Sequence, residues 1–229
     1  MDEIDRIQRR YQERDADQLL SGFWTLANPV AVHLMQERER ITLQGLKRTG
    51  LKIKEAVLLD VGCGQGQEFA SFLRWGARPK NIFGVDVSAH RIEEARSLGI
   101  AQVNLISDTT LPFPSASFDL VIQNVVFSSI VEDSTRYALA TEMLRVLRPG
   151  GWLLWYDAAR TNTRDPHFRD IPRAEIEKLL PGLRWNWHPL TTHLGLLRRI
   201  NAIFGERGMR AFDLIGLYKT HWLGWGQKL

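Results

Sequence analysis

Apolar runs and segments of helical periodicity alternate through the middle of the chain. Apolar runs at residues 56–59, 82–87, 103–106, 118–122 and 152–156 predict five strands. Between these runs, apolar positions recur at helical spacing over residues 69–73, 89–96 and 134–147. Gly76 and Gly99 follow the first two of these segments as natural helix ends. Strands that alternate with helices over short connections indicate a parallel sheet with helices on both faces.

The two ends of the chain depart from this alternation. Residues 1–20 and about 32–48 predict two helices, and the second ends at Gly50. After residue 157, a strand-like stretch around residues 185–187, a helical segment at 194–203 and a second alternating stretch at 218–225 predict two more strands that complete one sheet edge. The alternating segments carry four tryptophans, which we interpret as sheet packing rather than as a platform for a sugar or a base: Trp185, Trp187, Trp222 and Trp225.

The composition describes an ordinary globular chain and narrows the classes of function. The 229 residues are 44% hydrophobic and 24% charged, and the single cysteine excludes both an intrachain disulfide and a cysteine-based zinc site. The first ten residues mix acids and bases, and no apolar run is long enough to cross a bilayer, so we expect a cytoplasmic protein. From residue 160 onward there are 12 Lys and Arg against 6 Asp and Glu, which favours either an anionic partner or simply a solvated basic face.

A glycine-rich loop follows the first predicted strand. The stretch 57–66 reads VLLDVGCGQG, so glycines occupy positions 62, 64 and 66 and an acid stands at Asp60. Glycines permit a tight turn and let a ligand approach backbone N–H groups at a helix start. A dinucleotide-binding loop requires its third glycine at the sixth position, which here is Gln67, and no Gly-Lys-Ser/Thr sequence indicates a nucleoside triphosphate loop.

This loop and three later motifs resemble those of class I S-adenosylmethionine-dependent methyltransferases. The later motifs are GVDVS at 84–88, SD at 107–108 with the LPFP and SFDLV segments that follow it, and LRVLRPGG at 144–151. The nearest type is the ubiquinone/menaquinone-biosynthesis-like, type 11 group, with a looser similarity to bacterial enzymes that modify surface glycans or natural products. The resemblance covers about residues 55–157.

The resemblance implies a Rossmann-like α/β fold with a seven-stranded, mostly parallel sheet, helices on both faces, an antiparallel last strand and an N-terminal helical extension. We expect one methyltransferase domain over residues 1–229. Within it, residues 1–50 would form a helical cap, 51–157 the cofactor-binding core and 158–229 the elements on the substrate side.

The resemblance also implies a set of residues that bind S-adenosylmethionine. Asp86 would accept hydrogen bonds from both ribose hydroxyls, Asp108 from the adenine amino group, and Asp60 would hold the methionine amino group. Val87 and Arg91 would sandwich the adenine, and backbone N–H groups of the glycine loop would meet the methionine carboxylate. The full set is Asp60, Gly62, Cys63, Gly64, Gln65, Asp86, Val87, Arg91, Ser107, Asp108, Thr109, Gln123 and Asn124. Singly each acid is equally a helix cap or turn residue, but acids at three successive strand ends favour a ligand site.

The acceptor side is less defined by the sequence. A hydroxyl acceptor requires a general base, for which Asp157, His167 and His221 are candidates, with His193 a further histidine near the C-terminus. Tyr11, Phe127, Tyr156 and Arg160 are candidates for the acceptor-site wall. Cys63 lies inside the glycine loop, so we expect a packed small residue rather than a nucleophile, and the sequence after the fourth predicted strand lacks the pattern of adenine-amino methylation.

The sequence therefore predicts a metal-independent methyltransferase that acts on a small-molecule or glycan-linked hydroxyl. N- or C-methylation of a small metabolite stays open, as do a NAD-dependent oxidoreductase and a catalytically silent cofactor-binding module. Nucleic acid is not expected as the acceptor, because the chain has no appended recognition module or basic run.

Overall fold

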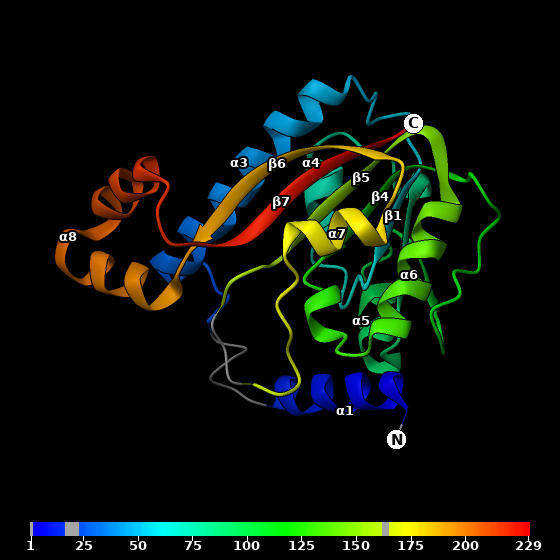
Figure 1. Ribbon diagram of the computed structural model, residues 1–229, viewed down its shortest axis with the longest axis horizontal. Coiled ribbons are helices and arrows are strands. Elements are labelled where there is room, and N and C mark those ends of the chain that lie inside the picture. The colour runs from blue at the N-terminus through cyan, green and yellow to red at the C-terminus, as the bar shows by residue number, and fades with distance from the viewer. Residues whose placement is uncertain (1, 17–22, 162–164) are drawn as a thin grey trace.

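A seven-stranded sheet forms the centre of the molecule (Figure 1). The computed structural model describes residues 2–16, 23–161 and 165–229. The strand order is β3-β2-β1-β4-β5-β7-β6. The strands are β1 (Leu58–Val61), β2 (Ile82–Asp86), β3 (Gln102–Leu105), β4 (Phe118–Asn124), β5 (Leu147–Ala158), β6 (Leu183–Thr192) and β7 (Lys219–Lys228). Strands β1 to β5 pair in parallel, whereas β7 runs antiparallel to both β5 and β6, so the predicted fold class is confirmed.

Helices cover both faces of the sheet because the central strands are apolar on both sides. Leu59 and Val121 belong to the hydrophobic cluster that includes α6 and α7, whereas Leu58 and Leu120 belong to the cluster that includes α3, α4 and α5. The helices are α1 (Glu3–Ala16), α3 (Pro29–Thr49), α4 (Phe69–Arg74), α5 (Ala89–Ser97), α6 (Asp133–Val146), α7 (Arg173–Leu179) and α8 (Leu194–Ile215), with short 3-10 turns η1 (Pro79–Asn81) and η2 (Phe127–Ser129).

Two elements are longer than the hydrophobic pattern predicts. β5 begins at Leu147 rather than at Trp152, because Leu147 pairs with Phe118, and the register then shifts so that Leu120 pairs with Trp152. The predicted helix at 194–203 continues to Ile215 through a kink at Gly205, whose φ of 59° is non-helical. The end of the predicted first helix, residues 17–20, lies outside the described residues.

The C-terminal tryptophans pack within the sheet layers, in agreement with their interpretation as sheet packing. The rings of Trp185 and Trp187 stack with centroids 4.4 Å apart. Trp225 lies against Gly45 of α3, where a Cβ atom would stand only 1.9 Å from the indole nitrogen. Gly45 therefore lets α3 approach the β7 strand closely.

A buried polar network ties α8 to the rest of the molecule. Asp213 of α8 contacts Nε2 of His33 at 2.6 Å and accepts hydrogen bonds from Thr192 and Lys219, each at 2.7 Å. Lys219 also donates to Glu37 at 2.7 Å. Although burial alone would raise the pKa of Asp213, the hydrogen bonds from its partners hold this pKa well below its usual range. The network thus joins α3, β6, α8 and the start of β7.

Candidate cofactor and acceptor site

The glycine loop forms a tight cradle after β1. Gly62, Gly64 and Gly66 have φ values of 73°, 53° and 79°, a region that side-chain-bearing residues rarely adopt. A Cβ atom on Gly62 would lie 2.4 Å from a methyl carbon of Val126, in the segment after β4. Glycine is therefore required both by the backbone conformation and by the close approach of the two strand ends.

Most N–H groups of this loop bond within the protein. Gly62 and Cys63 donate to the carbonyl oxygen of Val85 at 2.8 and 3.0 Å, and Gly64 donates to Oδ2 of Asp86 at 2.8 Å. The N–H of Gln65 is left as the loop donor for an anion among Gly62 to Gln65. The loop therefore offers fewer free backbone N–H donors to an anion than the sequence predicts.

Asp86 at the end of β2 keeps acceptor capacity on both carboxylate oxygens. Oδ1 accepts one hydrogen bond, from the N–H of Ser88 at 2.9 Å, and Oδ2 accepts the one from Gly64. A carboxylate oxygen has about two lone-pair sites, so each oxygen can accept one more hydrogen bond. The side chain is fixed by its two backbone donors, which suits it to hold a vicinal diol.

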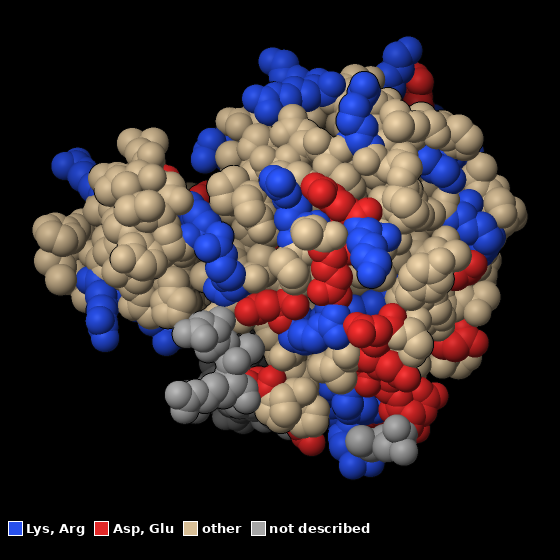
Figure 2. Space-filling view, viewed as in Figure 1, with Lys and Arg blue, Asp and Glu red and all other residues tan. Residues whose placement is uncertain are grey.

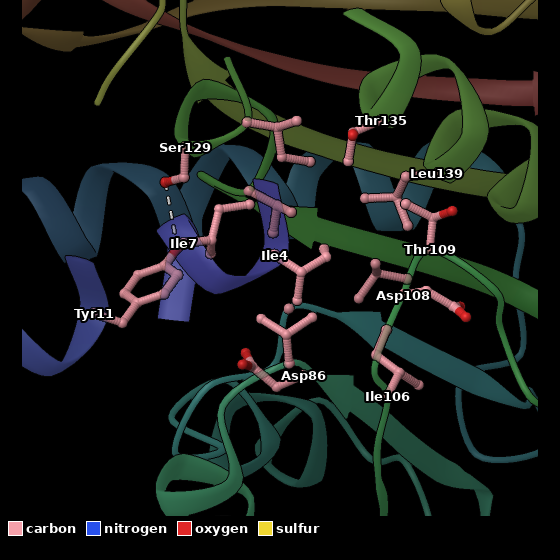
Figure 3. A pocket seen from close by; sticks show the side chains of 15 residues that line it. Ile4, Ile7, Tyr11, Asp86, Ile106, Asp108, Thr109, Ser129, Thr135 and Leu139 are labelled. Atoms are coloured by element: carbon pink, nitrogen blue, oxygen red, sulfur yellow. Dashed lines mark hydrogen bonds between the residues drawn. The ribbon is translucent and has the colours of Figure 1, made fainter. Parts of the chain in front are cut away.

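Asp86 lines a pocket at this edge of the sheet (Figure 3). Gly62, Asp86, Val87, Asp108 and Thr109 line it, so the structure brings these predicted residues together. The remaining lining comes from α1, the end of β1, α6 and the segments after β3 and β4, namely Ile4, Ile7, Tyr11, Val61, Ile106, Val126, Ser129, Ile130, Thr135 and Leu139. The pocket is thus apolar, with carboxylates at its edges.

Helix α1 closes one side of this pocket. Hydrogen bonds hold it to the segment after β2 and to the segment after β4. Gln8 donates to the carbonyl oxygen of Val87 at 2.7 Å, and Arg6 donates to that of Ser129 at 2.6 Å. Arg91 lies over the ring of Tyr11 at 4.1 Å. Tyr11 lines the pocket, whereas Arg91 is not among the lining residues and instead contacts α1 through Tyr11 and Asp15.

The loop after β3 presents two predicted polar residues to solvent. Ser107 and Asp108 are exposed, and Oδ1 of Asp108 accepts a hydrogen bond from the N–H of Thr110 at 2.6 Å. This turn lowers the pKa of Asp108 below its usual value. Asp108 is therefore an ionised acceptor at the pocket edge.

A cluster of charged residues, Asp60, Arg38 and Glu68, lies at the carboxyl end of β1. Asp60 is 2% exposed, and burial, together with the nearby carboxylates of Glu68 and Asp86, raises its pKa well above the usual range. Arg38 of α3 opposes this shift, pairs with Glu68 and lies over the ring of Tyr156 at 5.3 Å. Arg38 was not predicted from the sequence, because only the fold brings α3 to this strand end.

His221 and Tyr156 lie beside the cluster of Asp60, Arg38 and Glu68, where β5 ends and β7 begins. Their rings stack with centroids 5.1 Å apart, and the Tyr156 hydroxyl is 2.6 Å from the hydroxyl of Thr191. The hydroxyl of Thr220 donates its one proton to the carbonyl oxygen of Thr191 at 2.9 Å, so towards Nδ1 of His221, 2.8 Å away, it can only accept. Nδ1 of His221 is therefore protonated and Nε2 carries the lone pair. Burial lowers the pKa of His221 to about 4, although the nearby carboxylate of Asp170 raises this pKa by more than Arg38 lowers it.

Several predicted acceptor-side residues occupy other places. Asp157 is 1% exposed and its carboxylate accepts hydrogen bonds from the N–H groups of Phe127 and Ser128 at 2.9 and 3.2 Å, so it caps η2 instead of facing the pocket. Phe127 lies in the core against Trp155, with ring centroids 4.7 Å apart. His167 is exposed beside Arg6 on the outer side of α1. These three residues do not line the pocket.

The remaining predicted residues have mainly structural contacts or lie at the surface. Gln123 is fully buried, accepts from the N–H of Val126 at 3.2 Å and so supports the turn after β4, to which Asn124 leads. Cys63 packs against Gly84, and burial raises the pKa of its thiol, which disfavours the thiolate form. Arg160 and His193 are exposed.

Comparison with known proteins decides the family. A protein family described as a methyltransferase domain matches residues 59–155. An O-methyltransferase of Pyrenophora dematioidea is 32% identical over 205 residues, which cover 86% of this chain and 69% of that protein. The chain belongs to the class I S-adenosylmethionine-dependent methyltransferases.

Other relatives of this methyltransferase are longer proteins. A fatty-acid O-methyltransferase of Mycolicibacterium smegmatis is 37% identical over 125 residues, which are 52% of this chain and 40% of that protein. A trans-aconitate 2-methyltransferase of Azoarcus sp. is 35% identical over 169 residues, 69% of this chain and 64% of that protein. The chain thus spans only part of the length of these two relatives.

Solved structures share the fold of this methyltransferase at low sequence identity. A [4+2]-cyclase, SpnF, has a TM-score of 0.61 at 21% identity and covers 84% of this chain and 82% of its own. A methyltransferase of Methanosarcina mazei has a TM-score of 0.58 at 18% identity, covering 80% and 97% of the two chains. Because the first of these is described as a cyclase, the fold alone does not define the reaction.

The site of this methyltransferase fits S-adenosylmethionine. Asp86 has two free acceptor positions for a ribose, and the apolar pocket between Val87 and Ile106 suits an adenine ring. Arg38, which pairs with Glu68, and the N–H of Gln65 are donors for a carboxylate, and Asp60 offers an oxygen acceptor for an ammonium. The glycine loop connects the pocket beside Asp86 with the charged residues Asp60 and Arg38 at the end of β1.

Proposed function

We propose that this methyltransferase transfers a methyl group to an oxygen of a small acceptor, with a small-molecule or glycan-linked hydroxyl as the principal candidate. The observation that carries the proposal is the His221 ring at the polar strand ends, stacked on Tyr156, with the hydroxyl of Thr220 at its Nδ1 and Nε2 left for an acceptor. The relatives named as O-methyltransferases support oxygen as the acceptor atom.

The residues of this chain bind and orient the two reactants. When bound, S-adenosylmethionine supplies an electrophilic methyl group, so the protein has mainly to hold the donor and acceptor in line. Asp86 would fix the ribose, and Arg38 with Gln65 the methionine carboxylate. Helix α1 would keep water from the adenosine pocket through Ile4, Ile7 and Tyr11.

His221 would take the proton of the acceptor hydroxyl at Nε2. The low pKa of His221 keeps the ring neutral at neutral pH, and Thr220 keeps the proton on Nδ1, so Nε2 can accept a proton at neutral pH. No grouping of three or more metal-ligating side chains occurs within residues 2–16, 23–161 and 165–229, and we propose that the reaction proceeds without a metal.

A carboxylate acceptor is the second candidate, because Arg38 supplies a positive charge at the same strand ends. A carboxylate is ionised at neutral pH and requires no base. The names of the fatty-acid and trans-aconitate methyltransferases are consistent with this alternative.

Methyl transfer from labelled S-adenosylmethionine to matched hydroxyl and carboxylate compounds tests both candidates. For a hydroxyl acceptor, we expect His221→Asn to lower kcat by about 10²–10⁴-fold, the usual contribution of a general base. The matched control is His193→Asn, an exposed histidine at the start of α8. A carboxylate product with unchanged kcat in His221→Asn would establish the second candidate, and a methylated nitrogen or carbon would contradict the proposal.

The pH dependence of kcat gives a further prediction. A base with a pKa of about 4 is protonated only below that value, so the rate is expected to hold between pH 7 and 5 and to fall as the pH approaches 4. A fall centred near pH 6.5, the ordinary histidine pKa, would show that His221 is not held neutral as proposed.

A further inference from the structure

Helix α8 and the residues that lead to β7 form a lobe that projects beyond the sheet edge (Figure 1). We define this α8 lobe as residues 194–218. It is inserted between β6 and β7, and it packs on α3 through a small cluster that contains Leu197 and Met209. It is further joined to the rest of the chain by Asp213, which contacts His33 and Thr192, and by Arg198, which lies over the ring of Phe23.

The α8 lobe exposes large apolar side chains that a water-facing helix would not ordinarily carry. Leu214 is 90% exposed, Ile203 72% and Phe204 66%. Ile215, Leu217 and Tyr218 are also more than half exposed. Such a concentration of exposed apolar residues marks an interaction surface.

Arginines accompany these apolar residues. Arg198, Arg199, Arg207 and Arg210 are exposed along the helix, and Glu206 is the exposed acid, paired with Arg210. Figure 2 shows the lobe at the left as a largely uncharged surface with basic side chains at its edges. The other acid of the helix, Asp213, is turned inward to His33 and Lys219.

We propose that the α8 lobe docks on an anionic lipid membrane surface. Helices that carry Leu, Ile and Phe beside Arg lie in the membrane interface, with the apolar side chains among the acyl chains and the guanidinium groups at the headgroups. Two copies of the lobe placed face to face would bring their arginines together, so charge favours an anionic partner over a second copy. No helix in the described residues is long and apolar enough to cross a membrane, and docking in the interface requires none.

Docking of the α8 lobe would also affect the acceptor side of the site. The strand β7 that leaves the lobe begins with Lys219, Thr220 and His221, so the lobe lies next to the acceptor side of the site. A docked lobe would hold that side near the lipid surface. This consequence rests on the proposed function, whereas the docking itself does not.

Sedimentation with lipid vesicles tests the proposal on the full chain. We expect the protein to bind vesicles of phosphatidylcholine with phosphatidylglycerol at 3:1 and not vesicles of phosphatidylcholine alone. Phe204→Glu is expected to weaken binding at least tenfold, whereas Tyr137→Glu, on α6 and 64% exposed, provides a matched control that leaves binding unchanged. Arg199→Gln and Arg207→Gln are each expected to weaken binding about fivefold, since a basic residue near an anionic surface contributes about 1 kcal/mol.

Equal folding of all variants is checked by circular dichroism, and S-adenosylmethionine binding separates this test from that of the proposed function. Vesicle binding with no methyl transfer would support docking and count against the proposed chemistry alone. Absence of binding to the anionic vesicles would overturn the docking proposal, as would equal binding by Phe204→Glu. A dimer in sedimentation velocity that Phe204→Glu dissociates would also overturn it, in favour of a second copy as the occupant.

Discussion

At the scale of single residues, the acceptor side depends on where a few protons lie. Thr220 has one hydroxyl proton and gives it to the carbonyl oxygen of Thr191, which fixes the proton of His221 on Nδ1. The sequence shows Thr220 and His221 as neighbours but not this proton arrangement, because Thr191 lies on another strand. Tautomer control of this kind follows from the pairing of β6 with β7.

The tautomer is accessible to nitrogen-15 NMR of the imidazole, without any acceptor. In the unmodified protein we expect Nε2 of His221 to be unprotonated above pH 5. Thr220→Val removes the acceptor for Nδ1–H and is expected to give a mixture of tautomers, whereas Thr220→Ser restores the single form. The same tautomer in Thr220→Val as in the unmodified protein would show that Thr220 does not control it.

Asp157 makes stability depend on pH. Burial raises its pKa to about 6, despite hydrogen bonds from Ser128, Ala158 and Phe127 that act in the opposite direction. Since the native pKa lies above the unfolded value of 3.8, the contribution of this group is greatest below about pH 4 and is lost as the pH rises through about 6.

The free energy of unfolding that is lost as Asp157 ionises amounts to up to about 3 kcal/mol, because each unit of pKa difference corresponds to about 1.36 kcal/mol. In Asp157→Asn this part of the pH dependence is expected to disappear. Urea unfolding of both proteins at pH 4.5 and pH 7 measures it. A stability difference between them that is the same at both pH values would contradict the assignment.

At the scale of elements, α8 depends on its buried polar anchor. Lys219 lies between the carboxylates of Glu37 and Asp213, at 2.7 Å from each, and is itself buried from most solvent. Removing a buried charge leaves its partners unpaired in a medium of low dielectric constant. The position of α8 on α3 therefore relies on a positive charge at residue 219.

Lys219→Met is expected to lower the free energy of unfolding by about 3–5 kcal/mol, the usual cost of breaking a buried ion pair. Lys178→Met, on the exposed part of α7, is the matched control and is expected to change it by less than about 0.5 kcal/mol. Urea unfolding checks both. Equal stability of the two variants would mean that the network does not anchor α8.

The elements that the sequence predicts best are those whose signal is local. The runs that became β1, β2 and β4 are buried on both faces, so their apolar stretches mark them directly. The start of β5 depends on the pairing of Leu147 with Phe118, and the second half of α8 depends on packing of Met209 against α3. Such long-range contacts leave no local pattern.

At the scale of the whole molecule, the sheet brings remote segments to one edge. The glycine loop, Asp86 and the pocket were predicted from ordered motifs in the middle of the chain, each next to a strand end. Arg38 is 22 positions before Asp60 and comes near it only because α3 packs beside β6 and α8, where Arg38 pairs with Glu68. The assignment of Asp157 as a base failed for the related reason that its partners in η2 come from a different part of the chain.

The central claim is that S-adenosylmethionine binds where Asp86 and the glycine loop meet. Calorimetric titration of the unmodified protein, Asp86→Ala and Glu93→Ala tests it, since Glu93 is an exposed carboxylate on α5 close to Asp86 in sequence. We expect one S-adenosylmethionine per chain, no binding of NAD, and affinity at least tenfold weaker in Asp86→Ala, a loss of about 1.4 kcal/mol or more. Glu93→Ala should bind as the unmodified protein does. Equal affinity in Asp86→Ala, or binding of NAD in place of S-adenosylmethionine, would contradict the account.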